Sequence, residues 1–328
     1  MSERPVALIT GITGQTGGYL AELLVGSDWS VHGIVRDADD AEGSFVDRTP
    51  EAQLHSGDLA DGARMKEVVA DVAPDAIFNL GGISSVAYSW EHPQETGAIT
   101  GLGVGALLDG AATLGRETGR RVSFVQASSA EIFGNSTEQP QTELTPIRPV
   151  NPYGAAKAYA HLLVGVYRGL GLQASSCILY NHESPRRPET FVTRKITREV
   201  ARISLGSSDR LELGNLDAVR DWGWAPDYAR ALSLAAVGEP GDYVIASGVG
   251  HTVRDFVAAA FAAAGIDDWD GLVYQNPQFV RPLDATSLVG DPSRARDILG
   301  WIPEVGFDEM VRAMVENDIA ELRAAGTS

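Results

Sequence analysis

A glycine-rich turn near the N-terminus limits most strongly how this chain can fold. Residues 11–17 read Gly-Ile-Thr-Gly-Gln-Thr-Gly and stand between an apolar run at residues 5–10 and a helical pattern that begins at Gly17. Gly11 permits a tight turn, Gly14 lets the backbone approach a pyrophosphate, and Gly17 allows close contact between helix and strand. The N-terminus of the following helix offers free N–H groups to an anion. In this strand–turn–helix context the motif predicts dinucleotide binding.

Strand-like and helix-like segments alternate through the first 180 residues, which predicts an α/β fold with a doubly wound parallel sheet of the Rossmann type. Strands are expected at residues 5–10, 31–35, 53–56, 75–80, 121–126, 172–180, 211–213 and 243–245. Helices are expected at residues 17–25, 63–73, 99–114, 152–170, 191–205, 254–264, 293–299 and 307–324. Loops are expected at residues 37–47, as an exposed and mobile acidic stretch, and at residues 276–291.

The regular alternation of strand-like and helix-like segments ends after residue 180, which predicts two domains. We expect residues 1–180 to form the dinucleotide-binding domain, rejoined by the chain at about residues 225–245. Residues 181–328 are expected to form a smaller C-terminal domain that binds the substrate.

The charge and the cysteine content limit which partners the protein can bind and which compartment is expected for it. The net charge of −18 argues against nucleic acid and against an anionic membrane surface. The single cysteine, Cys177, excludes an internal disulfide, is expected to be a buried thiol and fits a reducing compartment. We find no segment of about 20 apolar residues and no charged leader, so a cytoplasmic protein without a membrane anchor is expected. The six histidines and one cysteine form no recognisable metal motif.

The end of the second predicted strand bears on the choice of cofactor. An acidic residue there binds the ribose hydroxyls of NAD, whereas an arginine accommodates the 2′-phosphate of NADP. Arg36 comes first and Asp37 follows it. This order favours NADP, with NAD as the alternative.

Tyr153 and Lys157 are one turn apart on a predicted helix, so both side chains face the same side. An ammonium beside a phenol lowers the pKa of the phenol, and the phenolate then takes a proton from an alcohol while hydride leaves the carbon. Such a pair also occurs by chance on many helices. The glycine-rich turn, and a hydroxyl at the end of the fifth strand, favour the catalytic interpretation.

Ser129 and Glu131 follow that fifth strand, where the carboxyl ends of parallel strands line a ligand crevice. Ser129 is placed to hydrogen-bond a substrate hydroxyl or carbonyl. Glu131 is the discriminating residue, because an elimination needs a base beyond the tyrosine and a simple reduction does not. The alternative for Glu131 is a helix cap or a surface carboxylate. The pattern predicts oxidation followed by elimination.

Basic residues gather after the sixth predicted strand, in residues 181–187 and 193–195, and recur at Arg220 and Arg281. In so acidic a chain they indicate a clamp for phosphate, which arginine binds with two parallel hydrogen bonds. Ion pairing with neighbouring acids is the alternative, and the spacing leaves both open. The acids concerned are Glu183, Glu189 and Asp221.

Motifs along nearly the whole chain resemble those of the extended short-chain dehydrogenase/reductases, and more narrowly those of the GDP-mannose 4,6-dehydratases. The Asn-His-Glu-Ser-Pro-Arg-Arg run at residues 181–187 and the Gly-Asn-Leu-Asp run at residues 214–217 are specific to this subfamily. The other stretches that carry the resemblance are residues 11–17, 31–36, 126–131, 152–157, 191–196, 220–223 and 288–293.

The resemblance implies a catalytic set. Tyr153, supported by Lys157, is the base for oxidation at C4 of the hexose, Glu131 removes the C5 proton, and Ser129 stands where the family usually has threonine. Water leaves from C6, and hydride returns there from the cofactor. The product of GDP-mannose is then GDP-4-keto-6-deoxymannose.

The resemblance also implies two binding sets. The cofactor positions are Gly11, Thr13, Gly14, Gln15, Thr16, Gly17, Arg36, Asp58, Leu59, Leu80, Gly81, Gly82, Tyr153, Lys157, His182 and Arg187. The positions for the GDP-sugar are Ser84, Asn181, Val192, Lys195, Gly214, Arg220, Arg281 and Asp284.

Several alternatives stay open. The enzyme acts on GDP-mannose or on a related GDP-sugar, such as a heptose. A 4-keto reductase or epimerase of the same fold is the competing activity, and a catalytically silent NADP-binding regulator is the competing class. Members of the family commonly assemble, so a homodimer or homotetramer is expected.

Overall fold

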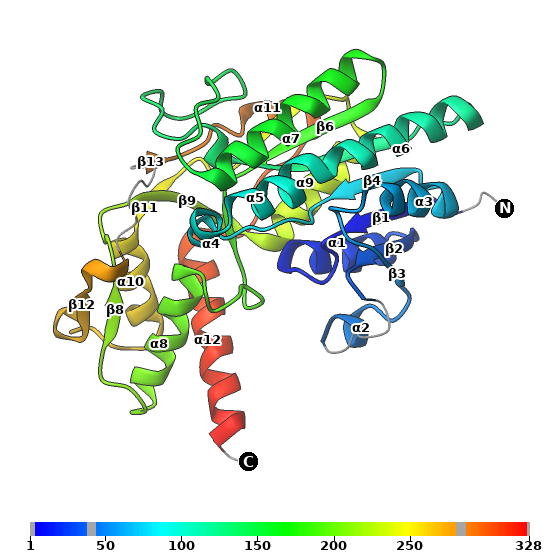
Figure 1. The fold of residues 1–328 in the computed structure, drawn as a ribbon. Coiled ribbons are helices and arrows are strands. Elements are labelled where there is room, and N and C mark those ends of the chain that lie inside the picture. The colour runs from blue at the N-terminus through cyan, green and yellow to red at the C-terminus, as the bar shows by residue number, and fades with distance from the viewer. Residues whose placement is uncertain (1–3, 38–43, 280–286, 327–328) are drawn as a thin grey trace.

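The computed structural model describes residues 4–37, 44–279 and 287–326. Its centre is a sheet of seven strands in the order β10-β6-β5-β4-β1-β2-β3, and every neighbouring pair is parallel (Figure 1). The predicted doubly wound sheet is thereby confirmed. The strands are β1 (Val6–Thr10), β2 (Ser30–Val35), β3 (Gln53–Ser56), β4 (Ala76–Asn79), β5 (Ser123–Ser129), β6 (Gln173–Leu179) and β10 (Asp242–Ile245).

Helices cover both faces of this sheet because its strands are apolar on both sides. Leu8 of β1 packs with Met65 and Leu107 on one face, while Ile9 packs with Leu20 and Leu232 on the other. One layer contains α1 (Gln15–Gly26) and α9 (Ala225–Val237). The other contains α3 (Gly62–Val72), α6 (Gly103–Thr118) and α7 (Pro152–Gly169).

The chain leaves the large sheet after β6 and returns to it. Segment α9 packs in the same core cluster as α1, and β10 pairs with β6 at the edge of the sheet. Residues 225–245 therefore lie with the large sheet although they follow residue 180. The division into a cofactor domain and a substrate domain stays a prediction.

A smaller layer of helices lies beside the large sheet, at the lower left of Figure 1. Its core joins side chains of α8 (Val192–Ser204), α10 (Val253–Ala263) and α12 (Phe307–Gly326) around Trp222 and Phe256. Short strands flank it: β7 (Asn181–Glu183), β9 (Val219–Trp224), β11 (Gly250–Thr252) and β13 (Ser287–Leu288) in one sheet, and β8 (Leu211–Leu213) with β12 (Val273–Gln275) in another. Helix α11 (Ser293–Leu299) packs near β10.

The helix expected at residues 99–114 begins earlier and changes its winding. Segment α5 (Pro93–Thr96) leads into the π-helix η1 (Gly97–Leu102), which continues as α6. A β-carbon on Gly103 would lie 2.7 Å from the carbonyl oxygen of Leu59, so glycine permits the close packing that the composition indicates. The short helix α4 (Val86–Glu91) lies at the end of the loop that follows β4, and η2 (Ala130–Ile132) follows β5 directly.

Three expectations from the sequence concern a buried cysteine and two loops. Cys177 is fully buried in β6, as predicted. The expected loop at residues 37–47 is wrong in part, because α2 (Ser44–Arg48) forms there and Phe45 is buried in the core; residues 38–43 lie outside the described residues. The expected loop at residues 276–291 contains η4 (Pro277–Phe279) and β13, and residues 280–286 lie outside the described part.

The expectation that no segment reaches the length of a membrane span is also wrong. Within the described ranges, one helical stretch, Pro93–Thr118, is long and apolar enough by length and composition, with a mean hydropathy of 1.3. However, 44% of an 18-residue window of this helix is buried inside the protein, and Val104, Leu107 and Leu108 belong to the core on the sheet. Its apolar content therefore serves the packing of a core helix.

Candidate active site

The carboxyl ends of the central parallel strands carry the predicted functional side chains to one edge of the sheet. Gly11 follows β1, Leu80 follows β4, Ser129 ends β5, and Tyr180 follows β6. The sheet order places β1, β4, β5 and β6 side by side, so these positions are neighbours. The order also reverses between β1 and β4, which is where ligands bind in open α/β sheets.

The glycine-rich turn fits a dinucleotide. Gly11 has φ +68, and a β-carbon on it would lie 2.8 Å from the backbone nitrogen of Gly81. A β-carbon on Gly17 would lie 2.2 Å from the carbonyl oxygen of Gly11. Helix α1 begins at the N-cap Gly14, which offers no side-chain cap to its N–H groups. An uncapped helix start behind a tight glycine turn is suited to a pyrophosphate.

His182 connects this turn to the segment after β6. Its Nδ1 lies 2.8 Å from the carbonyl oxygen of Tyr180, and its Nε2 lies 2.7 Å from the Thr16 hydroxyl. Burial and the neighbouring Arg187 and Lys157 charges lower the pKa of His182 to about 4. The ring is therefore neutral near pH 7. Since the carbonyl oxygen can only accept, Nδ1 carries the proton and Nε2 accepts from Thr16.

Gln15 forms a second connection between the same two segments. Its amide donates to the carbonyl oxygen of His182 at 3.0 Å and accepts from the hydroxyl of Ser184 at 2.7 Å. The glycine-rich turn and the Asn-His-Glu-Ser run are thus held against each other by side chains of both.

Tyr153 lies in the first turn of α7, close to the end of β5. Burial raises the pKa of its phenol to about 12; a hydrogen bond from Ser129 acts in the opposite direction, the charge of Glu131 raises the pKa further, and that of Arg187 lowers it. The backbone nitrogen of Tyr153 donates to the hydroxyl of Ser89 at 3.2 Å. These interactions bring the predicted catalytic tyrosine, serine and acid together.

The Lys157 ammonium was expected beside the Tyr153 phenol, but it points to the backbone of β5. Its Nζ donates to the carbonyl oxygen of Ala127 at 2.7 Å and lies 5.9 Å from the centre of the Tyr153 ring. Burial lowers the pKa of Lys157 to about 8. The expected lowering of the tyrosine pKa by Lys157 is not found, because burial of the phenol dominates and the ammonium points to the backbone of β5.

Glu131 lies in η2 and is held from the start of α7. Asn151 donates from Nδ2 to Oε2 of Glu131 at 2.8 Å. A β-carbon on Gly154 would lie 2.6 Å from the carbonyl oxygen of Glu131, so the two segments are in close contact. The backbone nitrogen of Glu131 donates to Oγ of Ser129 at 3.3 Å, which makes Ser129 the N-cap of η2.

Asn151 was missed by the reasoning from sequence. The signal was present, since an asparagine directly before a proline that opens a helix is typical of an N-cap. Its contact with Glu131, 20 residues away in the chain, was not readable from spacing.

Several of the basic residues are paired with acids. Arg187 lies 3.1 Å from the buried carboxylate of Glu183 and stacks 3.6 Å from the centre of the Phe191 ring. Glu189 pairs with Arg198 at 3.4 Å. Ion pairing thus holds for Glu183, whereas the partner of Glu189 lies outside the predicted basic group. Asp221 instead accepts hydrogen bonds from residues 247, 248 and 290.

The positions expected to bind the GDP-sugar form two groups. Lys195 lies with its Nζ 3.7 Å from the centre of the Phe279 ring, and a β-carbon on Gly214 would lie 2.6 Å from the carbonyl oxygen of Phe279. Asn181 of β7 and Arg220 of β9 lie on paired strands, and Arg220 donates to its neighbour's carbonyl oxygen at 2.8 Å. Ser84 and Val192 are exposed, and Arg281 and Asp284 lie outside the described residues.

Most of the remaining cofactor positions follow the ends of β2, β3 and β4, and one lies in the glycine-rich turn. Arg36 is exposed just after β2, and Asp58 is exposed after β3, where its Oδ1 accepts from the backbone nitrogen of Ala60 at 2.8 Å. A β-carbon on Gly81 would lie 2.8 Å from Cδ1 of Leu59. The other members are Thr13, which is exposed, Leu80, which is partly buried, and Gly82, with φ +151.

Sequence comparison decides the family. A family model described as GDP-mannose 4,6 dehydratase matches residues 8–314. The chain belongs to the GDP-mannose 4,6-dehydratase family. The prediction of a sugar-nucleotide dehydratase, an enzyme of the lyase class, is thereby confirmed.

Individual relatives agree with this dehydratase family. The chain is 42% identical to GDP-mannose 4,6 dehydratase 2 of Arabidopsis thaliana, covering 96% of this chain and 87% of the relative. It is 41% identical to GDP-mannose 4,6-dehydratase of Yersinia enterocolitica, covering 97% and 94%. Among solved structures, the Thermus thermophilus UDP-glucose 4-epimerase complex with NAD matches with a TM-score of 0.83 at 27% identity, covering 95% and 98%. The prediction of a nicotinamide-dependent family is thus confirmed.

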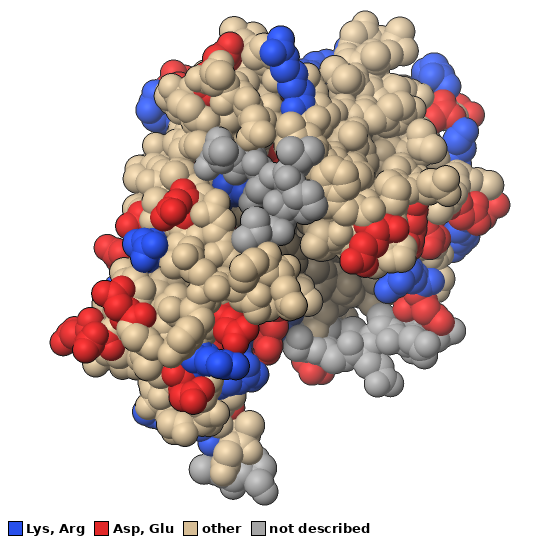
Figure 2. Space-filling view, turned by 60° about the vertical axis from the view of Figure 1, so that its left-hand side comes forward, with Lys and Arg blue, Asp and Glu red and all other residues tan. Residues whose placement is uncertain are grey.

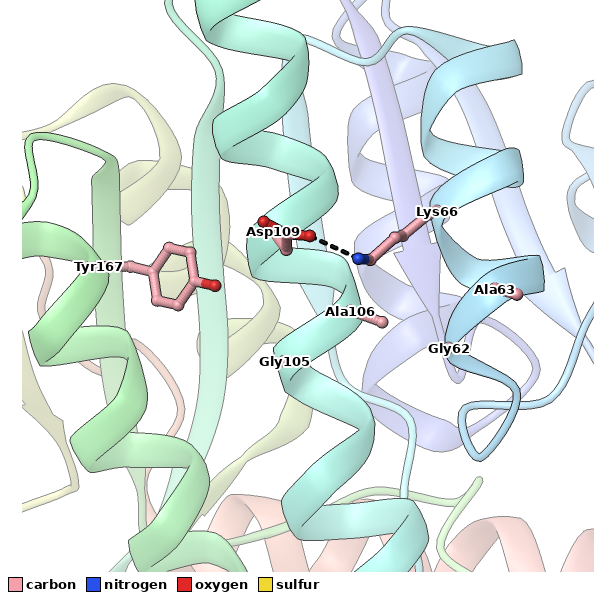
Figure 3. A pocket seen from close by; sticks show the side chains of 7 residues that line it. All are labelled: Gly62, Ala63, Lys66, Gly105, Ala106, Asp109 and Tyr167. Atoms are coloured by element: carbon pink, nitrogen blue, oxygen red, sulfur yellow. Dashed lines mark ion pairs between the residues drawn. The ribbon is translucent and has the colours of Figure 1, made fainter.

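Figure 2 shows acidic and basic side chains interspersed over the face in view, with a hollow near its centre. The hollow drawn in Figure 3 is a different one. It measures about 590 Å³ and lies between α3, α6 and α7, where Lys66 and Asp109 form an ion pair at 2.5 Å and Tyr167 points toward α6. Its lining shares no residue with the predicted site.

Proposed function

We propose that this dehydratase converts GDP-mannose to GDP-4-keto-6-deoxymannose and water, using Tyr153 and Glu131 as its proton-transfer groups. The observation that carries the proposal is the meeting of these two residues at Ser129. The Tyr153 phenol hydrogen-bonds Ser129 and feels the charge of Glu131. Ser129 also accepts from the backbone nitrogen of Glu131 at 3.3 Å.

The ionised phenol of Tyr153, which the Ser129 hydrogen bond and the Arg187 charge favour, takes the proton of the C4 hydroxyl, and Ser129 hydrogen-bonds the same substrate oxygen. A nicotinamide dinucleotide, when bound, would supply the acceptor for the C4 hydride and the donor of that hydride to C6. Glu131 removes the C5 proton, which the new C4 carbonyl makes acidic, and passes it to the hydroxyl that leaves C6 as water. Tyr153 returns its proton to C5. The sum is the loss of one water from the hexose with no net oxidation.

The chain's own residues supply the binding. The start of α1 and Gly14 are suited to the pyrophosphate of the cofactor. Arg36 is exposed at the end of β2, which supports NADP over NAD. Lys195, Arg220 and Asn181 are the residues we assign to the nucleotide sugar, because cations and an amide suit a diphosphate and its hydroxyls.

Incubation with GDP-mannose and mass analysis of the product test the activity. The expected result is loss of one water without net consumption of NADPH. Stoichiometric consumption of NADPH on a 4-keto sugar, or interconversion of two sugars of equal mass, indicates the reductase or epimerase instead. Parallel incubation with a GDP-heptose identifies the related substrate if it turns over faster.

We propose that the enzyme is a homodimer or homotetramer and is located in the cytoplasm. Four apolar side chains of α7 and its C-cap, Tyr159, Leu162, Val166 and Leu170, are 47%, 57%, 57% and 79% exposed. They recur every three or four residues and so share one helix face. Burying such a face against the same face of a second copy is the simplest closed assembly.

A further inference from the structure

We infer that Asn151 is a positioning residue that holds the Glu131 carboxylate in the orientation needed to remove the C5 proton; this rests on the proposed function. The orientation of its amide is fixed by its partners. The backbone N–H of Gly154 can only donate, and it lies 2.7 Å from Oδ1 of Asn151. The other end is therefore the NH₂ group, which donates to Oε2 of Glu131 at 2.8 Å.

The helix start leaves this amide little freedom. Asn151 is 5% exposed and is the N-cap of α7, with Pro152 in the first turn behind it. Gly154 is packed so closely on Glu131 that a β-carbon there would lie 2.6 Å from the glutamate carbonyl oxygen. The same helix start carries Tyr153, so one local structure sets the positions of both proton-transfer groups.

The hydrogen bond fixes the direction of the Glu131 carboxylate. Oε2 accepts from Asn151, which holds the carboxylate in one orientation. In the elimination the C5–H electron pair forms the C5–C6 double bond, the C6–O bond breaks, and the C5 proton goes to the carboxylate. That proton then joins the departing C6 oxygen, which leaves as water.

Asn151→Ser removes the hydrogen bond to Glu131 while keeping the helix cap. Serine caps a helix as well as asparagine does, but it does not present an amide donor to Glu131. We expect hydride transfer from C4 at the wild-type rate, together with water loss slowed at least ~10-fold, on the scale of a mispositioned general base. We also expect a larger isotope effect with GDP-mannose deuterated at C5, because the C5 proton transfer becomes limiting.

One control and one second test variant accompany Asn151→Ser. Asp61→Ala removes the side-chain cap of α3, where Asp61 accepts from the backbone nitrogen of Arg64 at 3.1 Å, and it should change neither step. Asn151→Asp keeps the acceptor for Gly154 but places a second carboxylate at Glu131, so it should slow water loss more than serine does. If Asn151→Ser does not fold, Asn151→Asp carries the same test.

The outcomes distinguish the two proposals. A wild-type enzyme that does not dehydrate GDP-mannose overturns the proposed function. An active wild type, with Asn151→Ser losing water within ~2-fold of it or slowed equally in both steps with an unchanged isotope effect, overturns the role of Asn151 alone.

Discussion

Lys157 and Tyr153 lie one helical turn apart on α7, yet the Lys157 ammonium is directed at the carbonyl oxygen of Ala127, 2.7 Å away, and not at the phenol. Burial drives the two pKa values in opposite directions, to about 8 for the lysine and about 12 for the tyrosine. Both shifts favour the neutral forms. Below pH 8 the folded protein therefore contains a buried charge at Lys157, which lowers its free energy of unfolding. The size of this effect can be measured.

Lys157→Met should leave the stability of the fold unchanged or raise it. The folded pKa of about 8 lies below the ordinary lysine value of 10.5, so the folded state disfavours the charge at every pH below 8, and the penalty is relieved as the pH rises toward 10.5. This penalty is about 3 kcal/mol, and leaving the Ala127 carbonyl oxygen unbonded in the variant costs ~1–3 kcal/mol in the opposite direction.

Urea unfolding at pH 7 measures this prediction. The expected free energy of unfolding is unchanged or higher by about 1 kcal/mol. A loss of more than ~2 kcal/mol would show that the charged amine stabilises the fold instead.

Tyr153→Phe should block the first hydride step. Phenylalanine keeps the ring but removes the oxygen that bonds Ser129 and, when ionised, receives the C4 proton. Rapid-mixing absorbance of transient NADPH, with bound NADP and added GDP-mannose, should show no signal. The matched control is Tyr159→Phe, an exposed tyrosine on the same helix, which should behave as wild type. Transient NADPH at the wild-type rate in Tyr153→Phe contradicts the assignment.

Glu131→Gln should stop the reaction after the first step. The amide keeps the shape of the side chain but accepts no proton, so product formation should fall ~100-fold or more, as for loss of a general base. Calorimetric binding of GDP-mannose should be unchanged. Glu138→Gln, an exposed acid in the loop that follows η2, is the control. Product formation within ~10-fold of wild type would exclude Glu131 as the base.

The sequence predicted the large-scale fold because its signals are local and strong. Apolar runs such as residues 6–10 and the glycine-rich turn specify strand, turn and helix without help from distant residues. The four-residue spacing from Tyr153 to Lys157 placed both on α7 for the same reason. The short strands β7, β9 and β11 were missed, since three to six polar or mixed residues carry no periodic signal.

The parts of the site that were not predicted depend on contacts between distant residues. Asn151 meets Glu131 across 20 residues, and Thr16 meets His182 across 166. Burial likewise decides the pKa values of Tyr153 and Lys157, and it is a property of the whole packed structure. Spacing on one helix identified the pair but did not show that its members point to different partners.

Stability should fall in mild acid because of His182. Its folded pKa of about 4 lies below the ordinary histidine value of 6.5, so its contribution is fully present above pH 6.5 and is lost as the pH falls toward 4. The stability lost over this range is about 3 kcal/mol. Urea unfolding of His182→Gln between pH 7 and 4.5 should show a shallower dependence on pH than wild type. His92→Gln, at an exposed histidine, should keep the wild-type slope.

The exposed apolar face of α7 should hold two copies together. Leu162 and Val166 are each 57% exposed and lie one turn apart, so a glutamate at Leu162 puts a charge in the centre of the face. Light scattering should show wild type as a dimer or tetramer and Leu162→Glu as a smaller species, with the melting temperature of the fold unchanged at high dilution. Leu144→Glu, at a leucine that is 92% exposed in a loop outside this face, is the control and should keep the wild-type mass. An unchanged mass for Leu162→Glu would move the interface elsewhere, because a buried unpaired charge costs several kcal/mol and would not be tolerated at its centre.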